Sequence, residues 1–492
     1  MTLELCLSIA GAVGVFALTR FVMKKPWLIS VLLGAAVLLA CNTQWFKPSL
    51  EAVGQVVGGR IVLIAAAAVM LLLIVMKAPV FIAVFAGAVV YYLFMVDGGI
   101  NQFIFARKGV GAMDSASLLS IPFFVCAAAF MNRGGVTRRV LNLCKAVSGR
   151  LPGGMAQAGV LLSALTGGIA CSDLANADAQ AGTLAPEMEE SGCSKAFSSA
   201  VTAASAMLTG LIPPGIAMIL YAAVTDVPLD RLFVSGIAAG LILCAAMMAL
   251  VHLVSVKRGY GPARAERMPG REFLRCLGSA LPALCLPVIV ICGICLGAFS
   301  AAEAGAAAVL YVIVLGLIYR ELTWESALRA CKETVIVTGG IMLIVSAASV
   351  FSWALAKERL PEQLAQLVMR VCPGKTAFLA GVSVMMLLAG MFVDGNAVLL
   401  LAAPVLAPIA AQYGINGVHF AMVIILGTVL GGLTPPMSPL RTTVCSVTGC
   451  RTKPFNREAA PFCLLALALL ILFTFVPSLT TGIVRLVFGA AQ

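Results

Sequence analysis

Two stretches of the chain place acidic, amide and hydroxyl side chains in the middle of long apolar segments. The first reads GGIACSDLANAD at 167–178 and the second reads GMFVDGNA at 390–397. Their oxygen-bearing side chains include Ser172, Asp173, Asn176, Asp394 and Asn396. Hard cations such as sodium bind several oxygen ligands, and a helix interrupted at such a point adds backbone carbonyls. Ser, Asp and Asn also cap helices well, so the residue types leave a cation site and helix caps as alternatives.

Paired prolines follow each stretch, in TGLIPPG at 209–215 and GGLTPPM at 431–437. Proline removes a backbone donor and frees carbonyls of the preceding turn, so each pair predicts a break inside an apolar helix. The freed carbonyls could complete a cation site, and the half-helix after the break directs its positive end at the same place, which suits an anion. The alternative is that the prolines only kink the helices for packing.

If these residues bind ions and solute rather than cap and kink helices, they give two sets of candidate ligands. Candidate sodium ligands are Ser172, Asp173, Asn176, Gly210, Pro213, Asp394, Asn396, Gly432, Thr434 and Pro436. Candidate ligands of an anionic solute are Gly168, Ser172, Pro214, Gly395, Asn396 and Pro435.

The composition places these residues in a membrane. Of the 492 residues, 61% are hydrophobic and 11% are charged, against about 25% charged in an average soluble domain. Apolar stretches long enough to cross about 30 Å of hydrocarbon recur along almost the whole chain. The formal charge is +12. The basic residues lie in short loops beside these stretches, as the positive-inside rule requires, so nucleic acid is not an expected partner.

An internal repeat relates the two candidate regions. At an offset of 222 residues and without a gap, 168–214 matches 390–436 at 13 of 47 positions. The identities include Gly and Pro pairs such as Gly168 with Gly390, Pro186 with Pro408 and Gly210 with Gly432. Two unrelated apolar segments would share Leu and Ala rather than these residues.

Directing the basic loops to the cytoplasm predicts the topology. The expected spans are 3–23, 27–41, 61–77, 79–96, 118–131, 197–222, 231–254, 281–296, 303–319, 333–355 and 417–440. The stretches 155–186 and 375–411 must each begin and end on one side, which predicts two re-entrant helical hairpins that open on opposite sides of the membrane. The non-helical tips must then be buried in protein or line a watery cavity, and the repeats are inverted, as in secondary transporters.

The expected fold is therefore an all-α polytopic membrane protein with inverted repeats, each with a re-entrant hairpin and a broken helix. Its parts are an N-terminal extension with about two spans (1–60), a first repeat (61–255), a basic cytoplasmic linker (256–276) and a second repeat (277–492). Amphipathic arms are expected at 136–150 and 357–370. Cys41 follows a short apolar run that resembles a lipoprotein processing box, but another hydrophobic segment precedes it.

Other chemistry finds little support. Most of the 16 cysteines lie in apolar segments, where they act as small packing residues, and two histidines are too few for a zinc site or a triad. We therefore expect no enzyme activity, no cofactor and no metal other than sodium. An intramembrane protease would need a second motif-bearing aspartate, and a passive channel fits inverted hairpins less well than alternating access.

The stretch from about 62 to 478 resembles the large membrane (M) subunit of TRAP transporters, the tripartite ATP-independent periplasmic systems. The resemblance is carried by IPFF at 121–124, MNRGG at 131–135, the first tip through Pro186, AAS at 203–205 before IPP, GMFVD at 390–394 and LTPP at 433–436. The chain differs from this family at Cys171 and Asp173, where the family tends to have small residues. Its first 60 residues hold fewer spans than the four of a fused small subunit.

This resemblance implies a sodium-coupled secondary importer in the bacterial inner membrane with an elevator-type mechanism. It implies a separate small membrane (Q) subunit and a periplasmic substrate-binding (P) protein, with a carboxylate, sialic acid or sulfonate as substrate. The alternative is an anion transporter of the same architecture that works alone or is coupled to protons.

Overall fold

The computed structural model describes residues 59–489, except 77, 96–100, 116, 171, 226, 263–268 and 373. Every regular element among these residues is an α-helix. The spans expected at 3–23 and 27–41, and Cys41, lie outside the described residues.

The described residues divide into two compact units. The smaller holds 59–110 and 347–360, and the larger holds 111–346 and 361–489. Because the candidate residues all belong to the larger unit, its helices position the site.

In the smaller unit, α4 (Gly59–Val75) and α5 (Val80–Met95) are two apolar helices packed against each other. They approach closely at Gly87, where a Cβ would lie 3.0 Å from the carbonyl oxygen of Ala66. The Tyr91 hydroxyl donates to Glu358 Oε1 at 2.5 Å. Two further helices reach into this unit, α6 (Asn101–Gly111) and the end of α17 (Trp324–Lys357).

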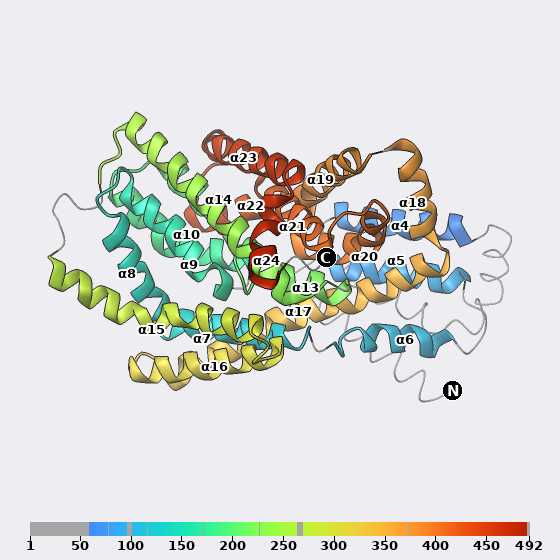
Figure 1. Cartoon of the computed structure of the whole chain (residues 1–492), viewed down its shortest axis with the longest axis horizontal. Coiled ribbons are helices and arrows are strands. Elements are labelled where there is room, and N and C mark those ends of the chain that lie inside the picture. Colours follow the sequence, from blue (N-terminus) through green and yellow to red (C-terminus); the bar gives the residue numbers. More distant parts are fainter. Residues whose placement is uncertain are drawn as a thin grey trace. The chain divides into compact units, whose positions relative to one another are not determined.

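One group of helices in the larger unit precedes the first hairpin or separates the two hairpins. These are α7 (Ser120–Arg133), α8 (Val136–Ser148), α15 (Gly270–Cys295), α16 (Ala301–Ile318) and the first part of α17. α16 packs against α7 and α15, and α15 also packs against α8 (Figure 1). α8 occupies the range of the first expected arm.

The first hairpin and the first broken helix follow in order along the chain. They comprise α9 (Gly154–Ala170), α10 (Asp173–Glu190), α11 (Lys195–Ala206), α12 (Leu208–Leu211), α13 (Ile216–Val224) and α14 (Leu229–Arg258). The second arm, α10, continues four residues past the expected end at 186, because it accommodates Pro186 within the helix. α9 and α10 pack against each other.

The second hairpin and broken helix are arranged in the same order. They comprise α18 (Leu360–Val371), α19 (Lys375–Phe392), α20 (Gly395–Gln412), α21 (Gly417–Leu433), α22 (Pro439–Thr448), α23 (Thr452–Phe475) and α24 (Ser478–Phe488). α18 occupies the range of the second expected arm.

The helix bounds repeat at the offset of the sequence repeat. Adding 222 to the bounds of α10 gives those of α20, and adding it to the ends of α9 and α12 gives the ends of α19 and α21. Side-chain caps repeat as well, since Ser172 and Asp394 cap α10 and α20 while Ser194 and Asn416 cap α11 and α21. The two regions thus share hairpin bounds and caps, while α11 and α12 of the first correspond to the single α21 of the second.

The half-helix that follows each break packs against the hairpin of the other repeat. α13, which follows the first break, packs against the second hairpin arm α20, and α22, which follows the second break, packs against the first hairpin arm α10. The Ser199 hydroxyl donates to Thr448 Oγ1 at 3.0 Å, which joins α11 to α22. Each hairpin is therefore packed against a part of the other repeat.

Eight segments within the described residues have the length and composition of membrane spans. They are Lys195–Val224, Leu229–Arg258, Gly270–Cys295, Ala301–Ile318, Trp324–Lys357, Lys375–Phe392, Gly395–Gln412 and Thr452–Phe475. The expectation of an all-helical, multi-pass membrane protein is confirmed.

Candidate functional site

The first hairpin tip begins α10 with two oxygen-bearing side chains. Ser172, in extended backbone, accepts the Ala175 N–H through its hydroxyl at 3.4 Å. The Leu174 N–H donates to Asp173 Oδ1 at 2.9 Å. Both side chains are half-buried. Each oxygen that accepts these bonds retains further acceptor capacity, so capping does not exclude a cation ligand.

Beneath this tip lies a buried polar network. Asn176 donates through Nδ2 to Thr209 Oγ1 at 2.9 Å and to Ser163 Oγ at 3.3 Å. Gln180, one helical turn further along α10, donates through Nε2 to Ser163 Oγ at 2.7 Å and to Asn176 Oδ1 at 3.0 Å. Asn176 therefore ties the second arm, α10, to the first arm, α9, and to the turn before the first break.

The second tip is built on Asp394. Its Oδ1 accepts the Asn396 N–H at 3.1 Å and caps α20. A Cβ on Gly395 would lie 3.6 Å from Thr428 Cβ, so this tip rests on the middle of α21. Asp394, Gly395 and Asn396 are all half-buried.

The carboxylates of the two tips lie within electrostatic range of each other. The charge of Asp394 acts on Asp173, although the residues belong to different repeats. Within the described part of the chain, neither carboxylate forms an ion pair with a lysine or arginine. Two neighbouring like charges repel each other, and positive charge, either a proton or a cation, relieves that repulsion.

The breaks lie where the prolines predict them. α12 ends at Leu211 and α13 begins at Ile216, while α21 ends at Leu433 and α22 begins at Pro439. Gly210, Pro213 and Pro214 fall at or in the first break, and Gly432, Pro435 and Pro436 fall at or in the second. Both Pro-Pro peptide bonds are cis.

Oxygens of the second break are already bonded to donors of this chain. The Ser438 hydroxyl donates to the Gly432 carbonyl at 2.9 Å, and Arg441 Nη2 donates to the Pro436 carbonyl at 2.6 Å. The Ser438 N–H donates to the Met391 carbonyl at 3.1 Å, which ties this break to the end of α19. The candidate ligands Gly432 and Pro436 thus have internal partners.

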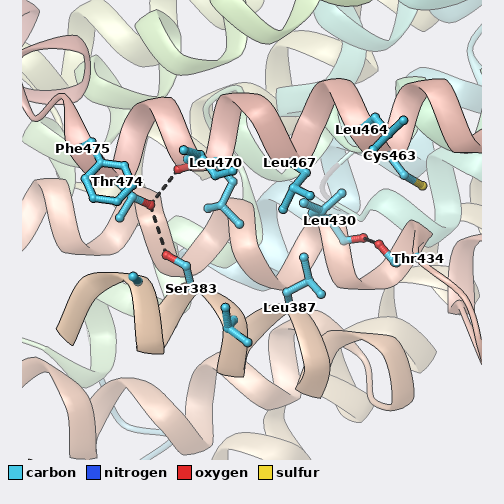
Figure 2. Close-up of a pocket in the computed structure, with 13 residues that line it drawn as sticks. Ser383, Leu387, Leu430, Thr434, Cys463, Leu464, Leu467, Leu470, Thr474 and Phe475 are labelled. Atoms are coloured by element: carbon cyan, nitrogen blue, oxygen red, sulfur yellow. Dashed lines mark hydrogen bonds between the residues drawn. The ribbon is translucent and has the colours of Figure 1, made fainter. Parts of the chain in front are cut away.

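Thr434 faces a different environment from the other candidates. It lines a cavity of about 390 Å³ between α19, α21 and α23, together with apolar residues and Cys463 (Figure 2). Its hydroxyl donates to the Leu430 carbonyl at 2.7 Å, and the Ser383 and Thr474 hydroxyls at the other end lie 3.1 Å apart (Figure 2). The apolar lining makes this cavity a poor site for a small anion.

Several polar residues around the tips and breaks are not among the candidate site residues predicted from the sequence. Ser163, Gln180, Thr209, Thr428, Ser438 and Arg441 all bond to or pack on predicted residues. Gln180 could have been found from its position four residues after Asn176, on the same face of one helix. Gly168 lies in the last turn of α9.

The fold and the site define a class of protein: a helical membrane transporter with two capped hairpins, two broken helices and a half-buried pair of carboxylates. Residues 67–479 match the family described as "Tripartite ATP-independent periplasmic transporter, DctM component". The chain belongs to this family, so the resemblance seen in the sequence is confirmed. It is a TRAP-type large permease and a multi-pass membrane protein.

Individual relatives agree with this assignment. The chain is 31% identical to the sialic acid TRAP transporter large permease protein SiaM of Vibrio cholerae, over 82% of this chain and 94% of that protein. It is 32% identical to the C4-dicarboxylate TRAP transporter large permease protein DctM of Pseudomonas aeruginosa, over 75% and 86%. The solved structure of the Alcanivorax borkumensis YdaH transporter has the same fold, with a TM-score of 0.59 at 16% identity over 81% of this chain and 91% of that one.

Proposed function

We propose that this chain is the permease subunit of a sodium-coupled secondary importer of a small organic anion in the bacterial inner membrane. A separate small membrane (Q) subunit and a periplasmic substrate-binding (P) protein would complete the transporter. The family assignment and relatives named for sialic acid, C4-dicarboxylate and isethionate support a carboxylate, sialic acid or sulfonate as the class of substrate.

The observation that carries the coupling proposal is the pair of tip carboxylates. Asp173 and Asp394 come from different repeats, the charge of Asp394 acts on Asp173, and neither has an ion-pair partner among the described residues. A cation bound beside them offsets their repulsion and leaves the positive ends of α13 and α22 for the anion. Loading the cation would thus prepare the site for substrate.

The packing of the half-helices supports inverted repeats that work as one transport domain. Because each hairpin packs against the half-helix of the other repeat, moving one hairpin alone would break its interface with that half-helix. A rigid movement of both hairpins with their broken helices keeps these contacts. This is the elevator-type movement that we propose for the chain.

The first test is thermal unfolding of the detergent-purified chain across a sodium titration, with potassium at equal ionic strength. A cation at 100 times its dissociation constant stabilises the folded state by ~2.7 kcal/mol. We expect sodium to raise the unfolding temperature of the wild type and to have a weaker effect on Asp173→Asn and Asp394→Asn. Asp178→Asn is the matched control, since Asp178 is exposed on the same helix as Asp173.

Superimposed sodium and potassium curves for the wild type would contradict sodium coupling. The alternative function, a stand-alone or proton-coupled anion transporter, is separated by uptake into vesicles. Uptake that requires the added periplasmic protein and a sodium gradient supports the tripartite importer. Uptake without that protein, or driven by a proton gradient alone, supports the alternative.

A further inference from the structure

Arg441 is a buried cation at the second helix break. Its side chain donates to the carbonyl oxygens of Pro436 at 2.6 Å and Met437 at 3.1 Å, and to Asn456 Oδ1 at 3.2 Å. The residue is 9% exposed, and its Nε is buried without a hydrogen-bond partner. No carboxylate of the described residues forms an ion pair with it.

This location is electrostatically costly for a guanidinium. Arg441 lies in the first turn of α22 (Pro439–Thr448), where the helix dipole disfavours positive charge. Burial of a charge without an opposite charge adds a desolvation cost. The hydrogen bonds to three oxygen atoms offset these costs. The guanidinium is therefore stable at this place because the oxygen atoms converge on it.

The oxygens around Arg441 are of the type that bind a sodium ion. Two are backbone carbonyls in or beside a helix break and the third is a side-chain amide oxygen, and such neutral oxygens are ordinary ligands of hard cations. A guanidinium in their midst supplies the positive charge that a bound ion would otherwise bring.

The equivalent position of the first repeat carries no hydrogen-bond donor in its side chain. The residue 222 positions before Arg441 is Ile219, which is fully buried in α13. An isoleucine side chain has neither charge nor hydrogen-bond donor, so it cannot occupy the oxygens of the first break. The two breaks, which share their prolines and helix bounds, therefore differ in their content of fixed charge.

We propose that Arg441 is a resident cation that occupies the oxygens of the second break in place of an exchangeable ion. The coupling cation then binds at the first repeat only, within range of both tip carboxylates. This inference rests on the cation coupling proposed above and specifies its stoichiometry. The chain binds one exchangeable cation, whereas two equivalent repeats would bind two.

The test uses the dependence of unfolding temperature on sodium concentration, because its slope at high concentration grows with the number of ions bound by the folded state. The full-length chain in detergent is compared with Arg441→Met, Arg441→Ala and Arg441→Lys. Removal of the charge should make the slope about twofold steeper than in the wild type. Arg441→Lys, which retains the charge, should keep the slope of the wild type.

Methylguanidinium provides a second readout that does not depend on the slope. In Arg441→Ala it should raise the unfolding temperature and return the sodium slope to that of the wild type. The matched control is Arg329→Ala, which removes an exposed arginine paired with Glu325, and methylguanidinium should not stabilise it. If Arg441→Ala requires a ligand to fold, recovery by sodium or methylguanidinium but not by potassium supports the proposal.

The outcomes distinguish this inference from the coupling proposal. A folded Arg441→Ala with the sodium slope of the wild type and no response to methylguanidinium overturns the resident cation, even where the wild type binds sodium. A variant that fails to recover in sodium, potassium or methylguanidinium also overturns it. If the stability of the wild type does not depend on sodium but that of Arg441→Ala does, the result supports the resident cation and contradicts the coupling proposal.

Discussion

The amide of Asn176 donates a hydrogen bond of 2.9 Å to the hydroxyl of Thr209. This bond joins the second arm of the first hairpin to the last helical turn before the first break, 33 residues further along the chain. Both side chains are buried, with Asn176 6% and Thr209 1% exposed. The hairpin and the break are therefore held as one body by polar contacts in a low-dielectric interior.

Asn176→Ala should destabilise the folded chain, because it leaves the Thr209 and Ser163 hydroxyls and the Gln180 amide without their shared partner. The expected loss is about 1–3 kcal/mol, the range for a buried polar group left unsatisfied. Thermal unfolding in detergent measures it. Thr183→Ala, an exposed position of the same helix, is the control and should change stability by less than about 0.5 kcal/mol. Equal shifts for the two variants would contradict a structural role for the network.

Gly390→Ala should separate α19 from α21. A Cβ at Gly390 would lie 2.5 Å from the Thr428 carbonyl oxygen and 3.1 Å from Gly431 Cα, so backbone must move. Gly381, on the same α19, has open space around its Cβ position. We expect Gly381→Ala to stabilise the helix by up to about 1 kcal/mol and Gly390→Ala to destabilise the chain. Unfolding temperatures of the two variants that shift in the same direction would contradict this close approach.

Much of the architecture follows from the sequence because glycine, proline and cap residues act locally. The consecutive prolines at 213–214 and 435–436 remove two backbone donors in a row and interrupt their helices, and Ser172 and Asp394 are good N-cap residues by type. The extent of the hairpin arms was less predictable: a single proline at 186 costs one backbone bond, and packing of α10 on α9, α11 and α22 retains the helix to Glu190.

The contacts between distant residues could not be predicted from local pattern. Ser163 and Thr209 bond to Asn176 only because the fold brings α9 and α12 to α10. Arg441 follows an apolar segment, and its sequence position suggests a residue of a basic cytoplasmic loop. The structure buries it against the second break, because the carbonyls there point back toward α22.

Lys145 and Glu187 should couple α8 to the first hairpin. Their side chains form an ion pair between α8 and the end of α10, and both are partly exposed. Charge reversal of either residue should lower the unfolding temperature, and the double reversal Lys145→Glu with Glu187→Lys should recover most of the loss. The coupling energy should be about 0.2–1 kcal/mol and should fall at high salt. A double-mutant cycle with no recovery would show that the contact does not contribute to stability.

Asp394 combines two roles that substitution can separate. Its side chain caps α20 through the Asn396 N–H, and its charge acts on Asp173. Asp394→Ser should keep the cap, because a serine hydroxyl accepts an N–H of the first helical turn, as Ser172 accepts the Ala175 N–H at the equivalent position of α10. Asp394→Ala loses both and should be less stable than Asp394→Ser by about 1 kcal/mol in potassium, where the cation site has no ligand.

The response of stability to sodium then measures the contribution of the Asp394 charge separately from that of the helix cap. Both variants should show the same weakened response to sodium, because both lack the carboxylate, while they differ in potassium through the cap. The reciprocal variant Ser172→Asp keeps the cap of α10 and adds a third carboxylate near the tips, so it should raise the dependence of stability on sodium. If Asp394→Ser retains the full sodium response of the wild type, the carboxylate is a helix cap and the cation ligands lie elsewhere.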